Sequence, residues 1–269
     1  MKMLDRSIGR AAFGGDPANY HASRFPYPAR LWQALRERAG LRPGIDILEI
    51  GAGTGLGTSG LLAARPLRLL AVEPDERLAG FLRSNTAGAP LAILAEPFET
   101  AALPATSFDL VASATAFHWL DQLPALAKVR RVLKRGGHLA LWWNVYGDLE
   151  RADPFHEATT HLFTGHAVST AESTSGGPPF PLDEPARIAD LTAAGFAPDP
   201  PEFVRSTMVL DPMGVRRLYN TYSNVTSLPP AEREALLGGL VDVAERQFGG
   251  RVERNIVTAI YTARPGAGG

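Results

Sequence analysis

Hydrophobic positions follow two alternating periods along the first half of the chain. Short apolar runs rich in β-branched residues predict buried strands, and the stretches between them place apolar residues at helical spacing. Strands that alternate with helices build a mostly parallel sheet covered on both faces. The predicted strands are 45–50, 67–72, 91–94, 108–112 and 138–144, and the predicted helices are 27–39, 56–64, 75–84 and 123–133.

The pattern changes beyond residue 146. Helices are expected at 153–163, 185–194 and 230–248, strands at 202–210 and 252–263, and an exposed Ser/Gly/Pro-rich loop at 170–185. The last two strands are expected to pair antiparallel at one sheet edge. We expect one α/β domain with an N-terminal lid segment (1–40), a ligand-binding core (41–146) and a third part (147–269). That third part holds cap insertions, the remaining helices and the edge strands.

Composition and charge exclude several classes of function. The 27 Lys and Arg residues nearly balance the 28 Asp and Glu residues, which argues against a nucleic-acid partner. The chain has no cysteine, so disulfides and thiolate chemistry are excluded. His156, His161 and His166 are spaced by five, about 140° apart on a helix, so no metal site is expected. Without a signal-peptide pattern or an apolar stretch of membrane-span length, we expect a cytoplasmic protein that does not bind membranes.

A glycine-rich turn carries the strongest chemical signal. The predicted strand at 45–50 runs directly into Gly51, Gly53 and Gly55, and a helix follows. Glycines permit positive φ and close approach of the backbone to a ligand, and a helix N-terminus favours a negative group. Glu73 ends the next apolar strand, where an acid is suited to ribose hydroxyls.

Other nucleotide-binding motifs fit less well. Residues 55–60, Gly-Leu-Gly-Thr-Ser-Gly, formally match G-x-G-x-x-G, but the match begins five residues after the strand and two of its glycines fall inside the predicted helix. No Walker sequence is present, which argues against triphosphate hydrolysis. No Tyr-x-x-x-Lys pair follows a core strand. A nicotinamide-dependent oxidoreductase is therefore the enzyme class that these motifs favour least.

Several segments in series resemble class I S-adenosylmethionine-dependent methyltransferases: LEIGAGTG, Glu73, SFDLV and VLKRGGHLAL. AFHWLD (116–121) and LALWWN (139–144) are similar to the methyltransferase type 11 group, including trans-aconitate methyltransferase-like proteins. The resemblance implies a Rossmann-like sheet, mostly parallel with an antiparallel edge strand, with helices on both faces and a helical cap. It also implies S-adenosyl-L-methionine as the cofactor.

The resemblance also assigns site residues by position. Segment 95–99, AEPFE, departs from the family pattern, because Pro97 stands where an acid often bonds the adenine amino group. Phe98 still offers a backbone N–H and an apolar face. The implied cofactor-binding residues are Tyr20, Arg24, Glu49, Gly51, Ala52, Gly53, Glu73, Pro74, Phe98, Ser113, Ala114 and Phe117.

Methyl transfer needs a base only when the acceptor is poorly acidic, because the sulfonium is already activated. His118, just past the fourth strand, is the candidate base, and the alternative is a residue that orders Trp119. Side chains alternate along a strand, so only one of Trp142 and Trp143 can face the cleft. The substrate-binding candidates are Tyr27, Trp119, Trp143, Asn144 and Tyr222.

The sequence therefore favours methyl transfer to a small-molecule acceptor, at oxygen, by a monomer or homodimer. FHWL stands where DNA adenine methyltransferases carry a (D/N)-P-P-(Y/F) tetrad, so that activity is disfavoured. Three alternatives stay open. They are a protein that binds the cofactor but catalyses a non-methylating reaction such as a cyclisation, the oxidoreductase, and a binding module without activity.

Overall fold

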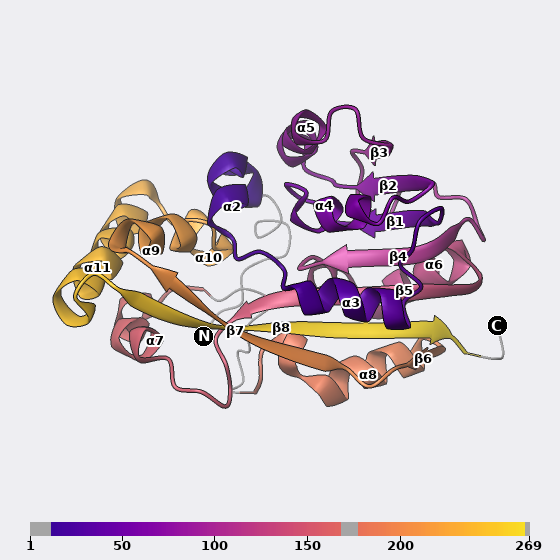
Figure 1. The fold of residues 1–269 in the computed structure, drawn as a ribbon. Helices are drawn as coiled ribbons and strands as arrows, with labels where there is room; N and C mark the ends of the chain where they lie inside the picture. The colour runs from indigo at the N-terminus through magenta and orange to yellow at the C-terminus, as the bar shows by residue number, and fades with distance from the viewer. Residues whose placement is uncertain (1–11, 168–176, 267–269) are drawn as a thin grey trace. The chain divides into compact units, whose positions relative to one another are not determined.

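A computed structural model of the chain describes residues 12–167 and 177–266 (Figure 1). These residues divide into two compact units, each assembled from separate stretches of sequence. The sheet unit comprises Pro26–Trp143, Pro181–Val204 and Thr258–Gly269, and the helical unit comprises Met1–Phe25, Asn144–Phe180 and Arg205–Val257. Both units are discontinuous in sequence, whereas the three predicted segments are contiguous.

The eight strands form one mixed sheet in the order β3-β2-β1-β4-β5-β8-β6, and β7 also pairs with β8. The pairs β1–β2, β1–β4, β2–β3 and β4–β5 are parallel, and β6 pairs antiparallel with β8. The mostly parallel sheet with an antiparallel edge strand is thus confirmed. The strands are β1 (Asp46–Ile50), β2 (Arg68–Val72), β3 (Leu91–Leu94), β4 (Phe108–Ala114), β5 (Leu133–Tyr146), β6 (Phe196–Pro198), β7 (Glu202–Leu210) and β8 (Val252–Pro265).

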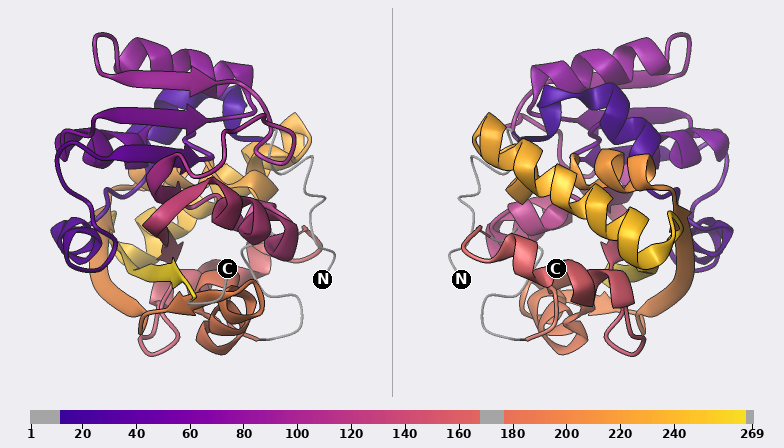
Figure 2. Two further views of the ribbon diagram at one scale, coloured as in Figure 1. Left: turned by 90° about the vertical axis from the view of Figure 1, so that its right-hand side faces the viewer. Right: turned by 90° about the vertical axis from the view of Figure 1, so that its left-hand side faces the viewer.

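Helices connect the parallel strands of the sheet unit, as the alternating pattern predicts. Asp75 caps α5 by accepting the backbone N–H of Arg77, and α5 lies against β3 (Figure 2). The helices are α3 (Ala29–Arg38), α4 (Leu56–Ala63), α5 (Glu76–Asn85), α6 (Gln122–Val132) and α8 (Glu184–Ala193), and Phe117–Trp119 forms a short 3₁₀ turn, η2.

The two tryptophans near the end of β5 face opposite sides of the sheet. The Trp142 ring is fully buried and lies 5.9 Å, centroid to centroid, from both Tyr27 and Trp32, in edge-on contacts. This cluster is so tight that a Cβ on Gly60 of α4 would lie 2.1 Å from the Trp32 ring. The Trp143 ring instead contacts Tyr261 of β8, with centroids 6.1 Å apart. The sheet is therefore buried on both faces.

The helical unit has a core of its own, in which α9 and α11 pack together (Figure 2). A buried ion pair joins Arg254 to Asp153 at 2.8 Å, and Arg254 also donates a hydrogen bond to the Tyr219 hydroxyl. The elements are η1 (Ala12–Gly15), α2 (Pro17–Ser23), α7 (Pro154–Thr159), η3 (Thr160–Phe163), α9 (Pro212–Tyr219), α10 (Ser223–Thr226) and α11 (Pro230–Phe248).

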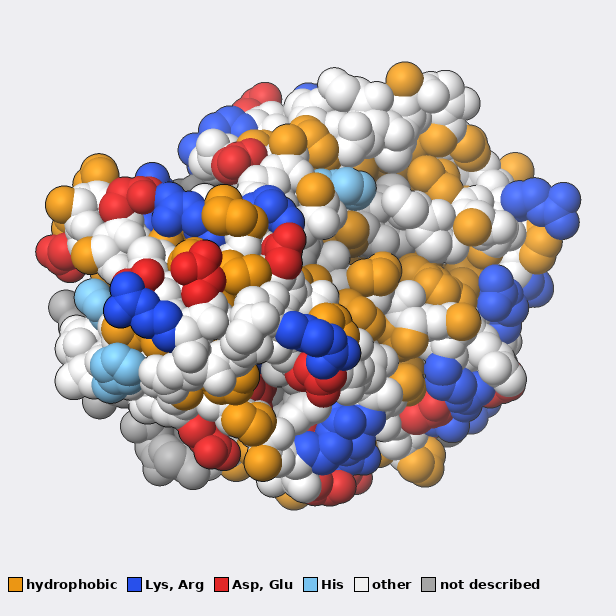
Figure 3. Space-filling model, turned by 60° about the vertical axis from the view of Figure 1, so that its left-hand side comes forward, with side chains coloured by type: hydrophobic (Ala, Val, Ile, Leu, Met, Phe, Trp, Pro, Cys, Tyr) orange, Lys and Arg blue, Asp and Glu red, His pale blue; other side chains and the backbone are white. Residues whose placement is uncertain are grey.

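The structure adds elements that the periodicity does not predict, namely α2, α9, α10 and the short β6. The predicted loop at 170–185 falls partly outside the described residues, and Phe180–Leu182 within it forms a 3₁₀ turn, η4. Within 12–167 and 177–266, no helix is long and apolar enough to cross a membrane. On the face drawn in Figure 3, basic and acidic side chains are intermingled.

Candidate active site

The glycine loop lies between β1 and α4 and adopts backbone angles that suit glycine. Gly51, Gly53 and Gly55 have φ values of +68°, +57° and +93°, in the left-handed region that other residues avoid. A Cβ on Gly51 would lie 2.4 Å from the Ala116 Cβ, so packing also excludes a side chain there. Ala52 is buried within the loop. Glycine is therefore favoured at Gly51, Gly53 and Gly55.

Glu73 at the end of β2 holds the glycine loop in place. Its Oε2 accepts the N–H of Gly53 at 2.8 Å, and its Oε1 accepts the N–H of Asp75 at 3.0 Å. The side chain is buried, and the following Pro74 is exposed. An ionised carboxylate has about four acceptor positions, so the same group can serve backbone amides and hydroxyls of a ligand.

Glu49 on β1 is a fully buried acid beneath the first turn of α4. Its Oε2 accepts a 2.6 Å hydrogen bond from the Thr58 hydroxyl, whereas Oε1 is shielded from solvent and has no partner among the described residues. A Cβ on Gly57 would lie 2.6 Å from that Oε1. Burial, with a smaller contribution from nearby Glu73, raises the pKa of Glu49 to about 8. The carboxyl is thus mostly protonated at neutral pH.

The end of β4 contributes a strained residue to the same edge of the sheet. Ser113 is buried, and its hydroxyl donates to the Ile50 carbonyl at 2.9 Å, which braces β4 against β1. Ala114 follows, half-buried. Thr115 has φ +53°, a region unusual for a β-branched residue, and its hydroxyl lies 2.9 Å from the hydroxyl of Tyr27. Strained residues of this kind cluster at ligand sites, and the sequence alone gave no sign of this one.

His118 lies in η2 between buried Phe117 and Trp119, and its ring centroid is 4.9 Å from that of Trp119. The indole Nε1 of Trp143 donates to His118 Nδ1 at 3.0 Å. An indole can only donate, so Nδ1 is the acceptor, and the neutral imidazole carries its proton on Nε2. In this arrangement His118 can donate from Nε2. It can accept a proton at Nδ1 only after the bond to Trp143 breaks, so its role as a base stays a prediction.

Lys128 of α6 fixes the segment that follows β3. Its ammonium nitrogen lies 5.0 Å from the centroid of the buried Phe98 ring. It also donates to the backbone carbonyls of Phe98, Glu99 and Ala101, at 2.5, 3.2 and 2.6 Å respectively. The sequence gives no sign of this role, because a lysine at this helical position is typical of a solvated face.

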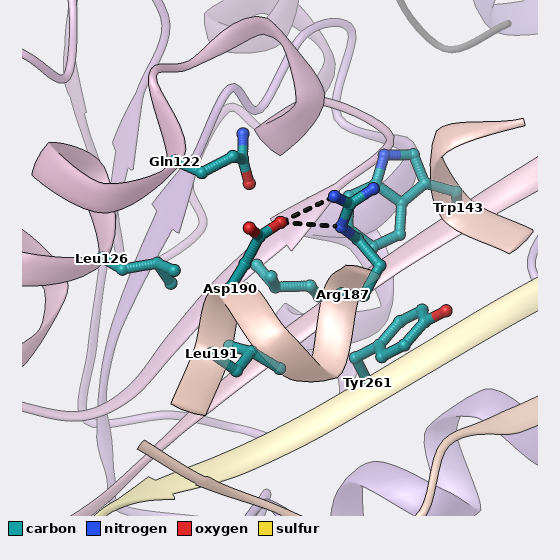
Figure 4. Close-up of a pocket in the computed structure, with 8 residues that line it drawn as sticks. Gln122, Leu126, Trp143, Arg187, Asp190, Leu191 and Tyr261 are labelled. Carbon is teal, nitrogen blue, oxygen red and sulfur yellow. Dashed lines mark hydrogen bonds and ion pairs between the residues drawn. The ribbon is translucent and has the colours of Figure 1, made fainter. Parts of the chain in front are cut away.

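Trp143 also borders a small cavity on the α6 and α8 side of the sheet (Figure 4). The cavity has a volume of about 10 Å³, close to that of one water molecule, so it is too small for an acceptor. Within it, Arg187 and Asp190 form a 2.6 Å ion pair. The lining residues are Gln122, Leu126, Leu141, Trp143, Arg187, Asp190, Leu191 and Tyr261.

Four predicted site residues, Tyr20, Arg24, Asn144 and Tyr222, belong to the helical unit. Arg24 lies among tyrosine rings that include Tyr20 and Tyr222, and Asn144 donates to the Phe25 carbonyl at 2.8 Å. The other candidates belong to the sheet unit. Among the described residues, no group of three His, Asp or Glu side chains is placed to hold a metal ion.

Known proteins share both the sequence pattern and the fold of this chain. Residues 48–141 match the model of the methyltransferase domain family. An uncharacterized methyltransferase of Schizosaccharomyces pombe is 28% identical over 263 residues, which cover 95% of this chain and 97% of that protein.

Two solved structures share the fold at low sequence identity. One, from Anaeromyxobacter dehalogenans, is assigned as a type II methyltransferase; it has a TM-score of 0.63 and 23% identity, covering 90% of this chain and 98% of that one. The other is the cyclase SpnF, with a TM-score of 0.58 and 17% identity, covering 100% of this chain and 99% of that one. These likenesses show the fold and do not decide the reaction. Together with the match over residues 48–141, they show that the chain resembles class I methyltransferases in its glycine-loop region and in its fold.

Proposed function

We propose that the protein transfers a methyl group from S-adenosylmethionine to a small-molecule acceptor, at oxygen. The observation that carries the proposal is the buried Glu73 carboxylate, which holds the Gly53 N–H at the point where β1 enters the glycine loop. This arrangement joins an acid suited to ribose hydroxyls with a loop that leaves room for a ligand against its backbone.

The residues present fit that cofactor. A Cβ on Gly53 would meet no atom within 4 Å, so a ligand can approach the backbone there, beside the Glu73 carboxylate that accepts the Gly53 N–H. The shielded Oε1 of Glu49, which has no partner within the described parts of the chain, suits a donor such as the aminium of the methionine part. The bound cofactor would supply an electrophilic methyl group on its sulfonium.

The chain's own residues would orient the acceptor and exclude water. Phe117 and Trp119 give the end of β4 a buried aromatic lining, which favours desolvation of a reacting oxygen. His118, with its proton on Nε2, can donate a hydrogen bond to an acceptor oxygen. We propose that the protein acts as a monomer or homodimer on a soluble acceptor, without nucleic acid or membrane. The near-neutral charge of the chain supports that view.

Calorimetric titration with S-adenosylmethionine, S-adenosylhomocysteine and NADH tests the cofactor. We expect the first two to bind and the third not to bind. Glu73→Ala should weaken S-adenosylhomocysteine by at least about tenfold, because a charge-assisted hydrogen bond contributes about 1.5–3 kcal/mol. Glu76→Gln, an exposed change in the first turn of α5, is the matched control. Unchanged affinity in Glu73→Ala, or binding of NADH alone, would refute the assignment.

Methyl transfer itself is tested with methyl-labelled S-adenosylmethionine and a panel of carboxylic acids, phenols and alcohols, with products identified by mass spectrometry. Labelled ester or ether products support the proposal. Cofactor binding without any labelled product from this panel, or labelled products at nitrogen or carbon alone, would contradict transfer to oxygen.

A further inference from the structure

The turn between β4 and η2 has an unfavourable backbone conformation. Thr115, the first residue after β4, has φ +53°, in the left-handed region that β-branched residues avoid. Its N–H donates to the Trp142 carbonyl at 2.7 Å, one residue beyond the last paired position of β4. A residue type that disfavours this conformation persists in it only where surrounding contacts hold it. Glycine would adopt the same φ without strain, so the feature to explain is the threonine hydroxyl.

The Tyr27 hydroxyl supplies a contact that holds this turn. Tyr27 lies two residues before α3, and its hydroxyl is 2.9 Å from the Thr115 hydroxyl, 88 positions away in sequence. The Tyr27 ring makes edge-on contacts with Trp32 of α3 and Trp142 of β5, with centroid distances of 6.3 and 5.9 Å. A ring packed against two others keeps one orientation, so its hydroxyl has a defined position. All four residues belong to the sheet unit.

The Thr115 turn determines where two neighbouring groups lie. Ala116 follows directly and packs on the glycine loop so closely that a Cβ on Gly51 would lie 2.4 Å from its Cβ. His118 of η2 comes two residues later, and its Nδ1 accepts the Trp143 indole N–H at 3.0 Å. The backbone has only two soft torsions per residue, so a change of φ at Thr115 would move Ala116 and η2 away from these partners.

We propose that Tyr27 is a positioning residue, whose hydroxyl holds Thr115 in the left-handed conformation and so fixes where Ala116 and η2 lie. The hydrogen bond offsets part of the strain in the turn, and its loss frees Thr115 to relax toward negative φ. This role differs from the direct substrate contact that the family resemblance implies for Tyr27. The placement of η2 is independent of the reaction, and only an effect on cofactor binding rests on the proposed function.

A double-mutant cycle on the two hydroxyls tests the proposal without a ligand. Tyr27→Phe and Thr115→Val each remove one hydroxyl, whereas Thr115→Gly removes a hydroxyl and the strain together. The readout is the nitrogen resonances of the His118 imidazole and the Trp143 indole, which report their hydrogen bond. We expect both resonances to shift in Tyr27→Phe and in Thr115→Val, and to shift no further when the two changes are combined, because both break the same contact. Thr115→Gly should keep the wild-type resonances, alone and with Tyr27→Phe, since glycine adopts this φ without strain.

Affinity for S-adenosylhomocysteine gives a second readout, by calorimetry. We expect Tyr27→Phe and Thr115→Val each to weaken binding about three- to tenfold, and Thr115→Ser, which keeps a hydroxyl, to bind as the wild type does. The matched control is Thr262→Val, which loses a 2.7 Å hydrogen bond from a buried threonine hydroxyl to Asp199 elsewhere in the sheet unit. This control should leave both readouts unchanged.

The outcomes separate a positioning role from a purely structural one. Wild-type imidazole and indole resonances in Tyr27→Phe would overturn the proposal, and a lower melting temperature alongside them would assign the hydroxyl to stability alone. Additive shifts in Tyr27→Phe/Thr115→Val, or a shift caused by Tyr27→Phe in the Thr115→Gly background, would overturn it equally. If the resonances follow the expected pattern but the wild-type protein does not bind S-adenosylhomocysteine, the proposed function fails and the positioning role stands.

Discussion

Glu49→Gln should change how the stability of this protein depends on pH. The carboxyl is fully buried, it accepts one hydrogen bond from Thr58, and its pKa is raised to about 8. In the unfolded chain the same group has its ordinary value of 4.5. Glutamine has the shape of the protonated acid and does not titrate. The substitution therefore removes the titration of this side chain and keeps its contact with Thr58.

The magnitude follows from the difference between the two pKa values. Between pH 4.5 and pH 8 the folded state holds up to one more proton than the unfolded chain, so the free energy of unfolding falls as pH rises. The slope approaches about 1.4 kcal/mol per pH unit in the middle of this window. Relative to an uncharged side chain at position 49, the ionising acid costs about 1 kcal/mol at pH 5.0 and about 4 kcal/mol at pH 7.5. The free energy of unfolding of Glu49→Gln, relative to that of the wild type, should therefore rise by about 3 kcal/mol from pH 5.0 to pH 7.5.

Urea unfolding at both pH values, followed by tryptophan fluorescence, measures this difference. Other titrating groups contribute equally to both proteins and cancel when the variant is compared with the wild type. Glu76→Gln, at an exposed position of α5, is the control for loss of a negative charge. If Glu49→Gln and the wild type show parallel pH dependence, then Glu49 is ionised in the folded protein and our account of its burial is wrong.

Three further substitutions test the packing of the site and of the helical unit. Gly51→Ala should lower the free energy of unfolding by about 1–3 kcal/mol in urea melts, because the new Cβ would lie 2.4 Å from the Ala116 Cβ; wild-type stability would refute this. Lys128→Met should weaken the binding of S-adenosylhomocysteine more than it weakens the binding of amino-acid fragments that lack the adenosine. The reason is that the Phe98 segment loses three hydrogen bonds to the ammonium. Equal calorimetric effects on both would contradict that role. Arg254→Met should cost about 3–5 kcal/mol in thermal unfolding, because it leaves Asp153 buried without its partner, and a change below about 1 kcal/mol would argue against a desolvated pair.

The order of strands and helices in the sheet unit could be predicted because its signals are local. An apolar run of five or six residues that leads into a glycine turn and a helix predicts a strand, and β1 with α4 has that form. The acid at position 73 follows the next run for the same reason. Local sequence therefore determined both the loop and the residue that holds it, Glu73 against Gly53.

The contacts that give the site its chemistry join residues distant in sequence. Trp143 reaches His118 across 25 positions, and Lys128 reaches the Phe98 carbonyl across 30. No periodicity encodes such a pair, because each depends on where two elements pack. The left-handed backbone of Thr115 is likewise imposed by its surroundings, since its own residue type disfavours it. Sequence reasoning could name His118 and could not assign its tautomer.

The helical unit was the least predictable part of the chain. Its residues come from three stretches, and the Arg24 guanidinium bonds a carbonyl 197 positions away. Arg24 was named from the family resemblance as a cofactor contact, but the absence of a nearby carboxylate in the described residues emerges only in three dimensions. Charge counting over the whole sequence does not show this arrangement, because a net charge of −1 averages over paired and unpaired groups.

If the proposed function holds, the hydrogen bond that His118 accepts favours an acceptor that is already ionised. Trp143 donates to His118 Nδ1, which leaves His118 as a hydrogen-bond donor and removes the simplest base from this edge of the sheet. A carboxylate acceptor needs no base at neutral pH, because its oxygen is already anionic and can attack an activated methyl group directly. An alcohol would need a proton acceptor, so faster methylation of alcohols than of carboxylic acids would contradict this reasoning.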